Sequence, residues 1–236
     1  MKFTLLKKFA EENNIILTDK QIQQFERFAE LLVEKNKVMN LTAIDDPKQI
    51  EIKHMIDSVS GAIVIDQLGL KDFSLLDIGC GAGFPGIPLK ISYPDNEFVL
   101  LDSLNKRINF VNEVSSLLEL KNLTGIAGRA EDFKERESFD IITSRAVARI
   151  NVLLEYMLPF AKVGGYVLLY KSGDFKEELD EAANALNILG GKFIMNFYFE
   201  LPEKGGARNI LVIEKVSSTP PKYPRRAGKP TKSPIC

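Results

Sequence analysis

Three glycines at alternate positions follow a short apolar stretch in the first half of the chain. Residues 75–86 read Leu-Leu-Asp-Ile-Gly-Cys-Gly-Ala-Gly-Phe-Pro-Gly. Because glycine has no Cβ, Gly79, Gly81 and Gly83 allow the backbone to turn sharply and a ligand to approach it closely. Such a loop after a strand is typical of nucleotide cofactor sites. The same segment also fits a dinucleotide pattern at Gly81, Gly83 and Gly86, so the glycines alone do not select the cofactor.

Carboxylates around this loop favour S-adenosyl-L-methionine. Asp102 ends the next predicted strand, where it can accept both hydroxyls of the ribose that either cofactor carries. Asp77 precedes the first glycine by two residues, where its charge would suit a cationic amino-acid group and oppose a pyrophosphate. Glu131 follows the third predicted strand and can accept a hydrogen bond from the adenine amino group. The alternatives are loop-amide binding for Asp77 and a solvated turn or helix cap for Glu131.

Few residues are suited to act on a methyl acceptor. Residues 143–149 lack the Asn/Asp-Pro-Pro-Tyr/Phe sequence that holds an exocyclic amine, and neither cysteine follows a proline. The absence of an evident general base fits a ring nitrogen with a free lone pair, such as guanine N7. Arg145 is the candidate to hold an anion, a guanine O6 or the cofactor carboxylate, with a surface ion pair as the alternative. His54 is a candidate for substrate positioning or, alternatively, a histidine satisfied by Asp57.

The spacing of apolar residues predicts the elements that must position these groups. Residues 18–21 fit a capping box before a long helix, and a second helix is expected over 50–65. After residue 73, short apolar runs alternate with amphipathic segments. The expected strands are 74–78, 98–101, 123–127, 139–143 and 166–170, and the expected helices begin at 85 or span 105–120 and 150–160.

The last part of the chain departs from this alternation. A helix over 175–189 is expected to end at Gly190, and two strands follow at 193–199 and 209–216. Their connection is too short for a crossover helix, so these strands are predicted to be antiparallel. Sheets that bind S-adenosylmethionine end in such a hairpin.

The predicted fold is therefore α/β, with a doubly wound, mostly parallel, Rossmann-like sheet of seven strands and an antiparallel C-terminal hairpin. This is the class I S-adenosylmethionine-dependent methyltransferase architecture. We expect an N-terminal helical extension over 1–70, a cofactor-binding domain over 71–216 and a basic, proline-rich tail over 217–236.

Composition restricts the class of protein. The chain has 236 residues, of which 45% are hydrophobic and 27% charged, enough for one large core with a small appendage. The longest uncharged run, over 78–89, is rich in glycine and proline, so no membrane span is expected. Early charged residues argue against a secretory signal, and Cys80 and Cys236 lack the spacing of a metal site. We expect a cytoplasmic protein that binds no metal.

Charge is concentrated at the C-terminal end. Residues 216–236 carry +5 in a chain of net charge −1, which leaves −6 on the rest. Such a tail predicts contact with a polyanion at one place. The candidate phosphate-binding residues are Lys222, Arg225, Arg226 and Lys229. Its prolines predict that the tail is extended and edge-lying or mobile. The alternative to contact with a polyanion is a solvated, disordered tail.

Several segments together resemble one family, the bacterial small-subunit ribosomal RNA guanine-N7 methyltransferases (RsmG, also called GidB). They are residues 75–89, 100–107, 128–131 and 144–146 in the core, 40–43 and 54–58 before it, and 223–230 in the tail. The resemblance covers nearly the whole chain and keeps the order and spacing of the family. It implies Gly79, Phe84, Ala130, Glu131 and Arg145 as cofactor contacts.

The resemblance also implies the reaction and the partner. A member of this family would methylate N7 of one guanosine in 16S ribosomal RNA, on the small ribosomal subunit or its assembly intermediate, and we expect it to act as a monomer. The tail would then bind RNA phosphate, so removing residues 220–236 is expected to weaken RNA binding in a salt-dependent way and to leave cofactor affinity intact.

Three alternatives stay open. They are a nicotinamide-dependent oxidoreductase, a methyltransferase for another RNA, a protein or a small molecule, and a ribosome-associated binding protein without activity.

Overall fold

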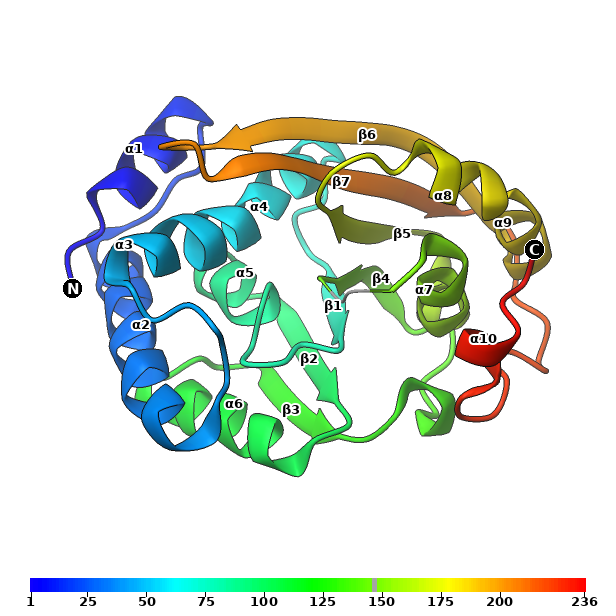
Figure 1. The fold of residues 1–236 in the computed structure, drawn as a ribbon, viewed down its shortest axis with the longest axis horizontal. Helices are drawn as coiled ribbons and strands as arrows, with labels where there is room; N and C mark the ends of the chain where they lie inside the picture. The colour runs from blue at the N-terminus through cyan, green and yellow to red at the C-terminus, as the bar shows by residue number, and fades with distance from the viewer. Residues whose placement is uncertain (146–147) are drawn as a thin grey trace.

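The computed structural model describes residues 1–145 and 148–236 and is built around a central sheet (Figure 1). The strand order is β3-β2-β1-β4-β5-β7-β6. The strands are β1 (Ser74–Ile78), β2 (Glu97–Asp102), β3 (Leu123–Ala127), β4 (Phe139–Ser144), β5 (Ala161–Lys171), β6 (Gly191–Leu201) and β7 (Gly206–Lys215). Strands β1 to β5 are parallel, and β7 pairs antiparallel with both β5 and β6. The predicted fold class and antiparallel finish are confirmed.

Helices cover both faces of the sheet. Successive strand residues point to opposite sides, so apolar side chains on both faces have to be buried. Leu75 and Phe98 belong to one core cluster, whereas their neighbours Leu76 and Val99 belong to the other. The first cluster includes residues of α1 (Thr4–Glu12), α2 (Asp19–Met39), α4 (Asp57–Gln67), α5 (Gly86–Ser92) and α6 (Asn105–Leu117). The second includes residues of α7 (Ile150–Met157) and α9 (Ala183–Leu189).

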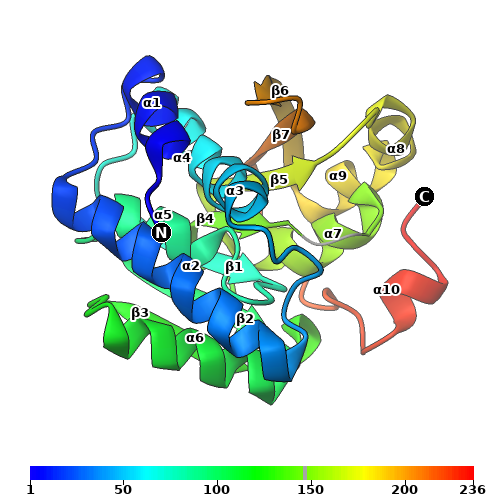
Figure 2. The same cartoon turned by 60° about the vertical axis from the view of Figure 1, so that its left-hand side comes forward.

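The N-terminal helices share the core of the sheet. The predicted capping box at the start of α2 is present, since Thr18 and Gln21 each accept the backbone N–H of the other. Phe28 on this helix is fully buried, with its ring centroid 5.1 Å from that of Phe84 and 6.4 Å from that of Phe110. Figure 2 shows α2 lying across α6. Helix α2 therefore packs directly on the glycine-rich loop that follows β1.

The second predicted helix begins earlier and is less regular than expected. It starts with α3 (Pro47–Ile50), because the Asp46 side chain accepts the amide of Gln49 at 2.8 Å and Pro47 suits a first helical position. A π-helical stretch, Glu51–Ile56, leads into α4. This stretch contains His54, and wide turns of this kind often occur at functional sites.

Other boundaries also differ from the expected ones. The expected helix over 175–189 is interrupted at Ala182, which gives α8 (Lys176–Glu181) and α9. Gly190 is left-handed, with φ 80°, as expected of a helix cap. Short 3₁₀ turns occur at Ala130–Asp132 and Leu158–Phe160. Strand β5 begins five residues before the expected 166, since Ala161 already pairs with Phe139.

The C-terminal segment, which we define as residues 219–236, packs on the body of the protein. Tyr223 and Ile235 are buried in the same cluster as residues of α7, and the segment includes α10 (Lys229–Lys232). Figure 1 places α10 beside α7. The alternative of a solvated, disordered tail is therefore wrong. Among residues 1–145 and 148–236, no helix has the length and apolarity needed to span a membrane.

Tight packing between α4 and β5 predicts the effect of one methyl group. A Cβ at Gly61 would overlap the Tyr170 hydroxyl, which donates to the Ser58 carbonyl at 2.8 Å. We expect Gly61→Ala to lower the free energy of unfolding by about 1–3 kcal/mol. Urea denaturation measures this loss. In the Tyr170→Phe background the same substitution should cost less, and equal losses in both backgrounds would contradict the predicted overlap.

Candidate functional site

A cavity of about 550 Å³ lies at the carboxyl ends of β1, β2 and β4. The strand order reverses between β1 and β4, and ligands of open α/β sheets bind at this position. The volume suits a ligand the size of a nucleoside derivative. The predicted site residues that line the cavity are His54, Gly79, Gly81, Phe84, Asp102, Ala130, Glu131 and Arg145.

The glycines of the loop after β1 have different roles. Gly81 is left-handed, with φ 57°, and a Cβ there would meet no atom within 4 Å. This glycine lines the cavity, so a ligand can reach the backbone there. Gly83 is also left-handed, but a Cβ there would overlap the Ile87 side chain. We expected Gly83 to contact the cofactor, whereas its position serves close packing of the loop on α5.

Asp77 departs from the expected cofactor contact. Its side chain is fully buried and is not among the cavity-lining residues. Its Oδ2 accepts the Gly86 amide at 2.9 Å, which is the loop-amide alternative. Burial raises the pKa of Asp77 to about 7, against the opposing effect of the Gly86 N–H. The Asp77 carboxyl therefore binds the backbone of the loop on the side away from the cavity.

Asp102 holds the other side of the same loop. Its Oδ2 accepts the Gly81 amide at 3.0 Å and an N–H of Arg107 at 3.2 Å, and its Oδ1 accepts the Leu104 amide at 2.9 Å. The carboxylate is 4% exposed but still forms part of the cavity wall. It thus fixes the backbone of Gly81 next to the position where a ligand would bind.

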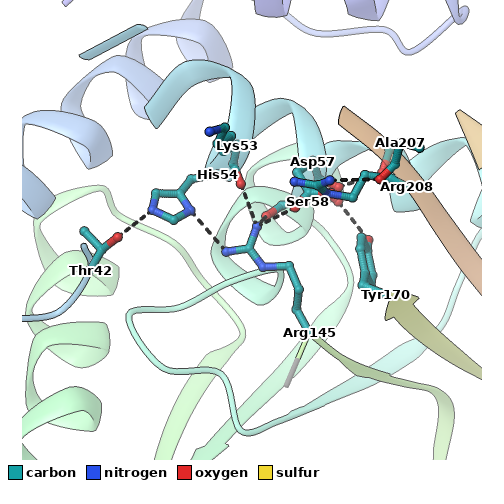
Figure 3. A network of polar contacts seen from close by, with 10 residues as sticks. Thr42, Lys53, His54, Asp57, Ser58, Arg145, Tyr170, Ala207 and Arg208 are labelled. Atoms are coloured by element: carbon teal, nitrogen blue, oxygen red, sulfur yellow. Dashed lines mark hydrogen bonds and ion pairs between the residues drawn. The ribbon is translucent and has the colours of Figure 1, made fainter. Parts of the chain in front are cut away.

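Arg145 lies at the centre of a polar network that joins the sheet to the N-terminal helices (Figure 3). Its Nη1 donates to Asp57 Oδ2 and to the Lys53 carbonyl, both at 3.1 Å, and its Nη2 lies 3.3 Å from His54 Nδ1. The guanidinium carbon is 4.9 Å from the centroid of the Phe84 ring, a cation–π distance. Arg145 is therefore held beside the loop, and its ion pair with Asp57 is not on the surface. Ala146, the last residue of the matching segment 144–146, lies outside the described residues.

His54 pairs with Thr42 and Arg145, whereas the sequence had suggested Asp57 as its partner. Its Nε2 is 2.8 Å from Thr42 Oγ1, and its ring stacks on Phe84 with centroids 4.6 Å apart. Since Arg145 can only donate, Nδ1 must accept and the proton must lie on Nε2. Burial and then the charge of Arg145 lower the pKa of His54 to about 3. The imidazole is therefore neutral.

Several residues of this region were not predicted from the sequence. Arg208 on β7 lies 3.3 Å from Asp57 Oδ1, so the buried Asp57 carboxylate faces two arginines. Thr42, Tyr156 and Thr231 line the cavity. Thr42 lay within a segment noted only for its resemblance. Arg208 is separated from Asp57 by most of the chain, and no local pattern marks it.

The basic residues near the C-terminus do not all face solvent. Arg225 donates to both carboxylate oxygens of Glu155, with Nε–Oε1 2.8 Å and Nη2–Oε2 2.5 Å, and Glu155 is fully buried. The expectation that Arg225 binds phosphate is therefore revised, because its charge neutralises a buried carboxylate. Lys222, Arg226 and Lys229 are exposed. Because Thr231 lines the cavity, intact cofactor affinity after removal of 220–236 no longer follows.

Comparisons with known proteins agree with this geometry. A family model described as rRNA small subunit methyltransferase G (GidB) matches residues 21–203. The "Ribosomal RNA small subunit methyltransferase G" of Lactococcus lactis subsp. cremoris (strain MG1363) is 51% identical over 226 residues, 94% of each chain. The protein of the same name from Staphylococcus carnosus (strain TM300) is 46% identical over 230 residues, 95% of each chain.

Solved structures share the fold at low sequence identity. A SAM-dependent methyltransferase from Aquifex aeolicus has a TM-score of 0.55 at 20% identity, covering 75% of this chain and 97% of that one. The M. jannaschii TYW2 structure in complex with AdoMet has a TM-score of 0.53 at 14% identity, covering 67% and 74% of the two chains. These similarities support the fold. The family match excludes the nicotinamide-dependent alternative.

The low pKa of His54 predicts a pH dependence of stability. As pH falls below 6.5, His54 binds a proton in the unfolded chain, whereas in the native protein it stays neutral until the pH is about 3. The contribution of His54 is therefore full above pH 6.5 and declines below it. Relative to His54→Gln, wild type should lose up to about 1.4 kcal/mol of unfolding free energy per pH unit between pH 6 and 4.

Urea denaturation of both proteins across this pH range measures the difference. The comparison with His54→Gln is necessary because Asp77, whose pKa is raised to about 7, contributes a slope of opposite sign. That slope is common to both proteins and cancels in the difference. Parallel pH profiles for wild type and His54→Gln would contradict a neutral native His54.

Proposed function

The chain belongs to the rRNA small subunit methyltransferase G family and is an S-adenosylmethionine-dependent methyltransferase, and we propose that it methylates N7 of a guanosine in 16S ribosomal RNA. The observation that carries this proposal is Arg145, which lies where the cofactor loop meets the N-terminal helices. Family membership supports the substrate, and this position supports Arg145 as the residue that acts on it.

The cavity fits S-adenosyl-L-methionine in size and in the chemistry of its wall. We propose that the backbone at Gly79 and Gly81 approaches the cofactor and that Asp102 accepts its ribose hydroxyls. Phe84 and Ala130 supply apolar contacts, and Glu131 accepts from the adenine amino group. When bound, the cofactor supplies a methyl group on a sulfonium sulfur, which keeps the electron pair of the broken bond.

Guanine N7 requires no general base. Its lone pair forms the new N–C bond directly, no proton leaves the ring, and the positive charge spreads over the base. The site agrees with this demand, because His54 has both ring nitrogens engaged, by Thr42 and Arg145, and a pKa of about 3. The protein would then act by placing N7 in line with the methyl group and excluding water.

Arg145 would position the base without adding an unopposed charge. A bare cation beside the methylated guanine would raise the energy of the product-like transition state. Here Asp57 lies 3.1 Å from Nη1 and offsets the guanidinium charge. Arg145 donates three hydrogen bonds from Nη1 to the protein. The N–H of Nε and the second N–H of Nη2 would therefore be the donors toward guanine O6 or the cofactor carboxylate.

The proposal extends to the partners of the protein and its place in the cell. We propose that the substrate is the small ribosomal subunit or its assembly intermediate, that the protein works as a monomer in the cytoplasm, and that Lys222, Arg226 and Lys229 bind RNA phosphate. These three side chains are exposed and lie within eight residues of one another along the chain.

The role of Arg145 predicts a specific kinetic loss. Arg145→Ala should lower kcat/KM for methylation of 16S rRNA from cells lacking the gene by about 100-fold, since misplacement of the reacting atoms alone can cost that much. Mapping of N7-methylguanosine by chemical cleavage identifies the product. His54→Gln should cost less, because it removes one contact to Arg145. Unchanged kcat/KM in Arg145→Ala would contradict the assigned role.

Exposed basic residues predict a salt-dependent RNA affinity. The triple variant Lys222→Ala/Arg226→Ala/Lys229→Ala should reduce the slope of log K against log salt by about 0.7 for each phosphate group that the protein no longer neutralises. Filter binding to 16S rRNA at several salt concentrations measures the slope. Equal slopes for the triple variant and wild type would contradict phosphate binding by these residues.

A further inference from the structure

The turn after α2 holds Thr42, a residue of the cavity wall, at a fixed position. The Asn36 side chain donates to the Thr42 carbonyl and accepts the Thr42 N–H, both at 2.9 Å. Asn40 ends the helix in the left-handed conformation, with φ 48°, and its N–H donates to the Asn36 carbonyl at 3.3 Å. Asn36 therefore closes the turn through its backbone and through both polar atoms of its side chain.

The Thr42 hydroxyl stabilises one tautomer of His54. Its oxygen lies 2.8 Å from His54 Nε2 and can accept the proton that this nitrogen carries (Figure 3). A neutral imidazole with the proton on Nδ1 would instead turn an N–H toward Arg145 Nη2, a donor 3.3 Å away. The hydroxyl therefore favours the tautomer that can accept from Arg145.

The imidazole of His54 is also held across its face. The Phe84 ring stacks on it with centroids 4.6 Å apart, and Phe84 in turn packs on Phe28 of α2, with centroids 5.1 Å apart. Helix α2 thus supports His54 twice, through Thr42 at the ring edge and through Phe84 at the ring face. The contact to Nδ1 uses one N–H of Arg145 Nη2, so it orients the donors that Arg145 keeps for a ligand.

We propose that Asn36 and Thr42 are positioning residues for methyl transfer, which keep Arg145 in its orientation through the ring of His54. The inference rests on the proposed function for the identity of the reaction. It extends the site from the loop after β4 to the end of α2. It also gives a physical role to residues 40–43, which the sequence marked only by a resemblance.

His54 is the single histidine of the chain, so its tautomer can be measured directly. Nitrogen-15 NMR of the full chain at neutral pH, where His54 is uncharged, distinguishes a proton on Nε2 from one on Nδ1. We expect the proton on Nε2 in wild type and in Thr42→Ser, which keeps the hydroxyl. Thr42→Val and Asn36→Ala should show a detectable fraction with the proton on Nδ1. A proton on Nδ1 in wild type, or an unchanged tautomer in both of these variants, would overturn the inference.

Kinetics test whether these residues act through Arg145. Asn36→Ala and Thr42→Val should each lower kcat/KM for methylation of 16S rRNA by about 3- to 10-fold, the usual effect of a lost hydrogen bond. In the Arg145→Ala background the same substitutions should cost less than about twofold, because the group that they orient is gone. Equal losses in both backgrounds would show that the residues act independently of Arg145 and would overturn the inference.

Gln24→Ala is the matched control on the same helix. Gln24 Nε2 donates to the Leu118 carbonyl at 2.8 Å, so this substitution also removes a hydrogen bond of α2, but one to the end of α6. It should leave kcat/KM and the His54 tautomer as in wild type. A kinetic loss equal to that of Asn36→Ala would contradict the inference, since it would follow from loosening of α2 alone. Absence of methylation by wild type would instead refute the proposed function, whereas the tautomer is measured without substrate.

Discussion

The arrangement of the site depends on one buried carboxylate and the two arginines that face it. Asp57 is 5% exposed and lies 3.1 Å from Arg145 and 3.3 Å from Arg208. A carboxylate this deeply buried is costly unless cations and hydrogen bonds compensate it, so the three residues stabilise one another only as a group. They come from α4, from the loop after β4 and from β7. Their pairing therefore sets the distance between the helical layer and the sheet at the cavity.

Much of this arrangement is local and could be predicted. The strands around the cavity have continuous or alternating apolar residues, and each ends in a residue that the parallel sheet brings to the same edge. Gly79, Asp102, Glu131 and Arg145 were found in this way, since each lies at or soon after the end of a strand. The sequence could not show which of these side chains face the cavity. The Asp77 side chain is buried and does not line it.

Long-range pairings could not be predicted in the same way. Arg208 and Thr231 reach the site only because β7 and α10 fold back across the sheet and α7. The charge of Arg225 suggested RNA binding, whereas its partner Glu155 is a helical glutamate whose burial no composition reveals. A cluster of positive charge in a sequence does not distinguish solvent-exposed cations from those that neutralise an internal acid.

The contacts of the Phe84 ring bear on how modular this enzyme can be. One residue of the cofactor loop touches Phe28 from α2, His54 from the π-helical stretch and Arg145 from the loop after β4. The helices that would select a substrate and the loop that would hold the methyl donor thus contribute aromatic rings to one packed cluster. Exchanging the first 70 residues between relatives would transplant part of the donor site along with the specificity, and such chimaeras would need a matched partner for Phe84 before they could work.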